Sequence, residues 1–142
     1  MRPRPRYAII PPMADMLHCT VVTPEGEVLD DAFAYVDLPL SDGRMGFAPK
    51  RAPIVAELGA GKMRAKSASG EQVLAIAGGF VQMDGQSMTV LTEYAASKAD
   101  LSRQDADQAL ADAQALPTDS QEQKAERQRK IDRARACVSL FA

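Results

Sequence analysis

The sequence has few of the residues from which active sites and covalent cross-links are usually built. It has no tryptophan, one histidine and two cysteines in 142 residues, and aromatic side chains make up only 5% of it. A single histidine removes most zinc sites and most histidine-based catalytic triads. Cys19 and Cys137 lie far apart without CxxC spacing, which favours a reduced, cytosolic setting. No segment approaches the roughly 18 consecutive apolar residues of a membrane span.

The composition otherwise indicates an ordinary globular chain. Hydrophobic residues make up 46% of it, and 17 basic against 19 acidic residues give a formal charge of -2. This balance gives no global electrostatic reason to expect a nucleic-acid partner. The length allows one domain, or a small domain with an appendage. Residues 1–15 have a basic, proline-interrupted start with too short an apolar run for a signal peptide, and they predict a flexible leader.

Between residues 16 and 94 the pattern predicts a small β-sandwich. All nine glycines lie between Gly26 and Gly85. Short apolar segments recur about every ten residues, separated by turn residues, as in antiparallel sandwiches and barrels. Asp84-Gly85 between two apolar runs predicts a hairpin, and Gly78-Gly79 predicts a bulge or the close approach of another backbone. The predicted strands are 17–23, 32–38, 44–47, 54–58, 62–67, 72–77, 80–83 and 88–92.

Residues 95–142 predict an antiparallel helical hairpin. Apolar residues follow a helical period over 101–116 and stop at Pro117, and the next three residues, 118–120, are all N-cap candidates. Four positions of the second helix form a narrow stripe suited to one partner helix: Ile131, Ala134, Val138 and Phe141. The first helix carries a net charge of -3 and the second +3. Because exposed ion pairs contribute only about 0 to 1 kcal/mol each, we expect a weakly held hairpin that can leave its dock.

The sequence offers poor material for catalysis. His18 and Cys19 are adjacent in a predicted strand, so their side chains should point to opposite faces. The segment 59–62, Gly-Ala-Gly-Lys, lacks the first glycine and the final Ser or Thr of a phosphate-binding loop. The neighbouring carboxylates Asp30-Asp31, and likewise Asp105 with Asp107, are typical of a solvated surface. We therefore predict a protein that is not an enzyme.

Four blocks in a fixed order resemble the epsilon subunit of the rotary ATP synthase. They are Val21-Val22-Thr23-Pro24-Glu25-Gly26, Gly43-Arg44-Met45-Gly46-Phe47-Ala48-Pro49 with Ala52-Pro53-Ile54-Val55, Ala77-Gly78-Gly79-Phe80-Val81, and Thr89-Val90-Leu91-Thr92-Glu93. The resemblance implies a sandwich and a two-helix domain without catalysis or cofactor. It implies a place in the central stalk at the cytoplasmic face of the energy-transducing inner membrane. The implied partners are the gamma subunit, the membrane rotor ring of c subunits and, when the hairpin extends to inhibit ATP hydrolysis, the beta subunit of the catalytic head.

The resemblance also suggests two groups of contact residues. A loop facing the ring is unusually basic here, since arginine stands where the family commonly has glutamate and Lys-Arg where it has Gly-His. We expect either acidic ring loops opposite it or simply a solvated loop; the residues are Arg44, Met45, Lys50 and Arg51. A basic group on the second helix is expected either to meet carboxylates of the catalytic head or to form a solvated face; it comprises Arg127, Lys130, Arg133 and Arg135.

Two alternatives stay open. Some relatives bind ATP through an Ile-Asp-x-x-Arg-Ala motif, whose positions here, Leu101, Ser102, Asp105 and Ala106, lack the arginine. Similar letters occur at 131–136, where packing of the stripe is the favoured interpretation. An ATP-sensing module whose hairpin clamps a nucleotide is therefore the less favoured hypothesis. A free-standing β-sandwich adaptor that ignores the gamma subunit is the other.

Overall fold

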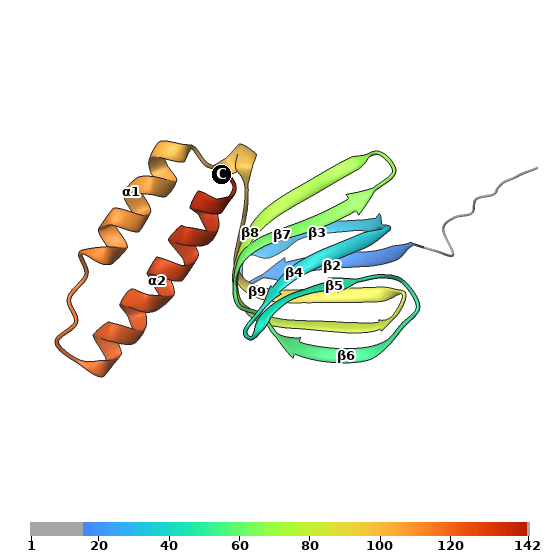
Figure 1. Ribbon diagram of the computed structural model, residues 1–142, viewed down its shortest axis with the longest axis horizontal. Helices are drawn as coiled ribbons and strands as arrows, with labels where there is room; N and C mark the ends of the chain where they lie inside the picture. The colour runs from blue at the N-terminus through green and yellow to red at the C-terminus, as the bar shows by residue number, and fades with distance from the viewer. Residues whose placement is uncertain (1–15, 142) are drawn as a thin grey trace, which may run out of the picture.

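The structure, a computed structural model, describes residues 16–141 and shows a β-sandwich followed by two packed helices (Figure 1). The predicted leader over 1–15 lies outside the described residues. The predicted fold class is confirmed. The elements are β2 (Leu17–Thr23), β3 (Gly26–Phe33), β4 (Tyr35–Leu40), β5 (Gly43–Phe47), β6 (Arg51–Glu57), β7 (Ala60–Ser67), β8 (Gly70–Gly85), β9 (Ser87–Ser97), the short 3-10 helix η2 (Lys98–Asp100), α1 (Arg103–Gln114) and α2 (Gln121–Ser139).

The strands form one hydrogen-bonded system that folds over into two layers. Their order is β3-β2-β9-β8-β7-β4-β5, and β6 also pairs with β8. Strand β8 pairs with β7 through its first half and with β6 through its second half, and β9 runs beside it throughout. The predicted hairpin at Asp84-Gly85 is confirmed: Asp84 is opposite Ser87, and Gly85 has a φ of 65°.

Three predicted strands were wrong in their bounds. The predicted strand 32–38 crosses a bend at Ala34 that separates β3 from β4. The predicted strands 72–77 and 80–83 are parts of the single strand β8. Its register with β9 continues without a shift from Leu74 to Asp84, so Gly78-Gly79 is not a bulge in that pair.

The double glycine changes which side of β8 faces the core. Leu74 and Ile76 are core residues before it, whereas Val81 and Met83 are core residues after it. Two successive glycines with φ of 76° and 106° make this reversal possible, because L side chains rarely adopt such values. A Cβ on Gly79 would lie 1.9 Å from the carbonyl oxygen of Leu91. The predicted close approach of another backbone is confirmed.

The helices pack on the outside of the first half of β8. In Figure 1, α2 lies between α1 and the strands, and its most extensive contacts are with α1, β7 and β8. A second, smaller core forms there from Ala75, Ala106, Ala136, Cys137 and Leu140, with Val73, Tyr94, Leu101, Val138 and Phe141 at its margin. The stripe prediction was therefore too narrow, because α2 packs against the sheet as well as against α1.

The capping residue of α2 is the last of the three candidates. The hydroxyl of Ser120 accepts a hydrogen bond of 3.1 Å from the backbone N–H of Gln123. The Gln123 side chain in turn accepts one of 3.2 Å from the N–H of Ser120. This reciprocal pair is a capping box.

Candidate functional site

The most exposed large apolar side chains lie on the outer face of the layer that contains β6, β9 and the second half of β8. Val55, Phe80 and Leu91 are 69%, 54% and 51% exposed, and we call these three residues the apolar face. Phe80 is directly opposite Leu91 in the β8–β9 pair. Val55 lies on β6 opposite Gln82, two residues along β8 from Phe80 on the same side. We take a cluster of this kind as a candidate contact surface.

The apolar face owes its exposure to the double glycine. Residues 73 and 75 point toward the helices in the first half of β8, and residues 80 and 82 occupy the outer side in the second half. The helices cover only the first of these two stretches (Figure 1). Sequence reasoning placed Phe80 in a strand but did not find its exposure. The signal that could have revealed it is the change of alternation on either side of residues 78–79.

The second feature of interest is the contact between α2 and the end of β9, where Tyr94 meets two α2 side chains. The guanidinium carbon of Arg133 lies 4.6 Å from the centre of the Tyr94 ring. The Tyr94 hydroxyl and the Cys137 thiol are hydrogen-bonded at 3.2 Å. Burial, and then the hydrogen bond with Cys137, raise the pKa of Tyr94 to about 12. Sequence reasoning missed this contact, because no local pattern pairs residues 94 and 137.

The four basic residues predicted on the second helix have different surroundings. The Arg127 guanidinium donates to the carbonyl oxygen of Gln114 at 3.3 and 3.2 Å, next to the end of α1. Arg133 covers the Tyr94 ring. Lys130 and Arg135 are exposed. Within the described residues no ion pair joins α1 to α2. The opposite net charges of the two helices therefore do not produce a direct contact between charged groups.

The four residues predicted to face the ring do not form one patch. Arg44, at the start of β5, pairs with Asp37 at 3.4 Å and donates to the carbonyl oxygen of Lys62 at 2.5 Å. Met45 is half-buried and packs against the main core. Lys50 and Arg51 follow the other end of β5, where Arg51 is opposite Gly85. Lys50 has a φ of 66°, which is uncommon for a residue with a side chain.

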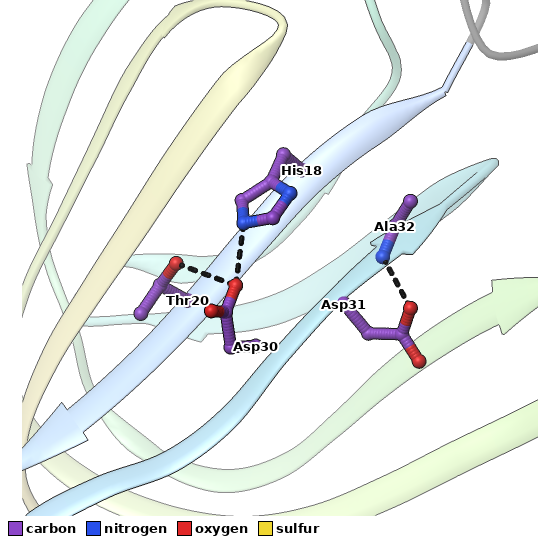
Figure 2. A network of polar contacts seen from close by, with 5 residues as sticks. All are labelled: His18, Thr20, Asp30, Asp31 and Ala32. Carbon is purple, nitrogen blue, oxygen red and sulfur yellow. Dashed lines mark hydrogen bonds and ion pairs between the residues drawn. The ribbon is translucent and has the colours of Figure 1, made fainter.

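His18 and Cys19 lie on opposite sides of β2, as predicted. Cys19 is fully buried in the main core, and burial, with a smaller effect of the Asp30 charge, raises the pKa of its thiol to about 12. His18 is exposed and pairs with Asp30, the Nε2–Oδ1 distance being 2.5 Å (Figure 2). The Thr20 hydroxyl donates to the same carboxylate oxygen at 3.4 Å. Asp31 points away from this group and accepts from the backbone N–H of Ala32 (Figure 2).

A hollow of about 330 Å³ separates α1 from α2. Three of the four positions that correspond to the ATP motif of some relatives line it together with Lys130 and Arg133: Leu101, Asp105 and Ala106. In the second helix, Ile131 and Ala134 are buried, which supports the packing interpretation of the similar letters at 131–136.

The described part of the chain shows neither a candidate metal site nor a candidate membrane-spanning helix. Residues 16–141 contain no group of three or more His, Cys, Asp or Glu side chains placed to hold a metal ion. Neither of the two described helices is both long enough and apolar enough to cross a membrane.

Comparisons with known proteins agree with the fold. The model of the ATP synthase delta/epsilon chain β-sandwich domain matches residues 16–98. The ATP synthase epsilon chain of Rhodopirellula baltica is 35% identical over 119 residues, which cover 84% of this chain and 93% of that one. The epsilon chain of Thermotoga maritima is 38% identical over 82 residues, 58% of this chain and 76% of that one.

Solved structures show the same architecture at low sequence identity. A chain of the Euglena gracilis mitochondrial ATP synthase, in a structure described as OSCP/F1/c-ring, superposes with a TM-score of 0.77 at 15% identity. The match covers 100% of this chain and 91% of that one. A chain of the Tetrahymena thermophila mitochondrial enzyme, described as central stalk/c-ring, gives 0.61 at 15% identity over 89% and 96% of the two chains.

The chain is a β-sandwich with an exposed apolar face and with two helices docked at its side. Because the domain model matches more than half of its length, the chain is a non-catalytic ATP synthase subunit of the delta/epsilon type. Within that class, the chain belongs to the ATP synthase epsilon chain family.

Proposed function

We propose that this chain is a central-stalk rotor subunit that couples the gamma subunit to the membrane rotor ring and regulates ATP hydrolysis through its two helices. It would then be peripheral, at the cytoplasmic face of the inner membrane. The family supports the role, and the relatives of similar fold come from assemblies described as F1/c-ring and central stalk/c-ring.

The apolar face is the observation that carries the coupling role. Phe80 and Leu91 lie side by side on two paired strands, so a partner covers both at once. Charged and polar neighbours such as Glu57 and Gln82 surround them, as in the polar rim of an interface. We assign gamma to this face and leave the helices on the other half of β8 free to move.

Replacing both central residues tests this assignment. Phe80→Ser together with Leu91→Ser should weaken co-purification with gamma by about tenfold or more, because large aromatic and aliphatic anchors dominate such interfaces. Both side chains are more than half exposed, so the free chain should stay folded, as circular dichroism can verify. The matched control is Val28→Ser, another exposed apolar residue, on β3. Undiminished binding of the double variant would remove gamma from this face.

The ring contact is proposed for the basic residues at the two ends of β5. Arg44 is held outward by Asp37, and Lys50 and Arg51 follow the strand. Met45, which packs inward, contributes to folding instead. If the ring loops are acidic, Lys50→Glu with Arg51→Glu should weaken attachment of the assembled stalk to the ring, and the effect should shrink as salt rises. Lys66→Glu, an exposed change on β7, is the control.

The regulatory role is best tested with Lys130 and Arg135, two exposed α2 cations that form no hydrogen bond or ion pair within residues 16–141. Lys130→Glu with Arg135→Glu removes charges available to the catalytic head, whereas changes at Arg127 or Arg133 also disturb docking. We expect the assembled enzyme with the Lys130/Arg135 variant to hydrolyse ATP faster. Lys124→Glu, near the start of α2, serves as the control. Equal hydrolysis by the wild-type and variant enzymes would count against control through these charges.

A further inference from the structure

The docking of the helices on the sheet converges on one side chain. Tyr94 stands at the end of β9, and its two α2 partners, Arg133 and Cys137, are one helical turn apart. One partner covers the face of the ring at 4.6 Å, and the other is hydrogen-bonded to the hydroxyl at 3.2 Å. A single residue of the sheet therefore contacts two successive turns of α2 through two different groups.

The other docking contacts bury mainly small side chains at their centre, with larger ones at the margin. The buried members of the second core are three alanines with Cys137 and Leu140, whereas the main core contains Phe33, Phe47 and many branched side chains. The polar link between Lys62 Nζ and the carbonyl oxygen of Ser139 is long, at 3.5 Å. Because burial of apolar area is the main stabilising term, the second core is the weaker of the two.

We infer that Tyr94 is the latch of the helical hairpin: losing its contacts with Arg133 and Cys137 opens the second core while the β-sandwich stays closed. The inference concerns the equilibrium between docked and undocked hairpin, and its regulatory meaning rests on the proposed function. Local opening of one cooperative unit at a lower free energy than global unfolding is a common property of small appended elements.

The two cysteines report on the two cores separately. Cys137 is 5% exposed in the second core, and Cys19 is fully buried in the main core. A maleimide that carries a polyethylene glycol chain meets Cys137 at the wall of the hollow between the helices, so the change of its labelling rate in the variants, and not the wild-type rate alone, measures undocking. The maleimide reaches Cys19 only after the sandwich opens. Mass analysis of the two cysteine peptides at successive times gives both rates from one sample of the full-length chain.

Two variants weaken the latch in different ways. Tyr94→Phe removes the hydroxyl but keeps the ring under the guanidinium. Arg133→Gln removes the cation and leaves the hydrogen bond between Tyr94 and Cys137 in place. Faster labelling of Cys137 in this variant therefore reports undocking and not a direct effect on the thiol. Each should speed labelling of Cys137 by about three- to tenfold, the size expected for one lost contact of this type. The control is Lys124→Gln, the same change of charge at an exposed position near the start of α2.

The latch is supported if Cys137 reacts much faster than Cys19, if both variants accelerate Cys137 alone, and if the control leaves both rates unchanged. It is overturned if the two cysteines react at one common rate, since the chain then opens only as a whole. It is also overturned if Lys124→Gln acts like Arg133→Gln. If labelling behaves as expected but Tyr94→Phe leaves hydrolysis by the assembled enzyme unchanged, the latch stands and the regulatory role of the hairpin falls.

Discussion

The hydroxyl of Thr92 donates a hydrogen bond of 2.7 Å to the carbonyl oxygen of Gly78. This bond lies where β8 changes the side that it presents to the core, and Thr92 is only 4% exposed. The positive φ of Gly78 and Gly79 disturbs the regular strand here, and a buried carbonyl that loses its partner is costly. The hydroxyl therefore stabilises the reversal on which the two surfaces of β8 depend.

Replacing Thr92 by valine, which has nearly the same shape, should lower the free energy of unfolding by about 1 to 3 kcal/mol, because the carbonyl is left without this donor. Urea denaturation followed by circular dichroism measures the change. Thr20→Val is the control, since that hydroxyl makes a weak surface contact of 3.4 Å with Asp30. A loss no larger at Thr92 than at Thr20 would contradict the role assigned to the hydroxyl.

Gly79→Ala should be among the most damaging single changes in the chain. The new methyl group would collide with backbone, 1.9 Å from the Leu91 carbonyl oxygen, in addition to the strain of a φ of +106°. We expect a loss of more than about 3 kcal/mol. Gly26→Ala is matched in its positive φ of +131° but has no atom within 4 Å of the new Cβ. It should cost only about 1 to 2 kcal/mol, and similar losses for the two would disprove the steric argument.

The start of α2 allows a test that distinguishes among three neighbouring candidates. Ser120→Ala removes the acceptor for the Gln123 N–H and should cost about 1 kcal/mol. Thr118→Ala should cost less than about 0.5 kcal/mol, because that residue lies two positions before the cap. Thermal unfolding of the two variants measures the difference. Equal losses would place the helix start elsewhere.

The chain should lose stability in alkali partly through Cys19. Burial raises the pKa of its thiol from 9.0 to about 12. Below pH 9 the thiol is protonated in both states, so this contribution is fully present. Between pH 9 and 12 the unfolded chain releases the proton and the folded chain keeps it, so stability falls as pH rises, by on the order of 1 kcal/mol per pH unit. Cys19→Ala should flatten the decline in denaturation experiments at pH 8 to 11; an unchanged slope would contradict this origin.

Local chemistry allowed much of the fold to be predicted. The Asp84-Gly85 turn, the opposite orientation of His18 and Cys19, and the capping box depend on neighbours within a few residues, so one sequence suffices to find them. The continuity of β8 through Gly78-Gly79 was missed, because glycine pairs commonly end strands and only pairing with β9 keeps this one extended. The contact of Tyr94 with α2 was also missed, since it joins residues far apart in the chain and depends on how two elements dock.

Because β8 reverses at its double glycine, its first half packs on the helices and its second half carries part of the apolar face. The two surfaces use different residues of the strand. In evolution the helices can then be shortened, remodelled or deleted without altering the surface offered by Phe80 and Leu91. A nonsense mutation just beyond Ser97 would remove both helices, yet leave every strand that carries the apolar face.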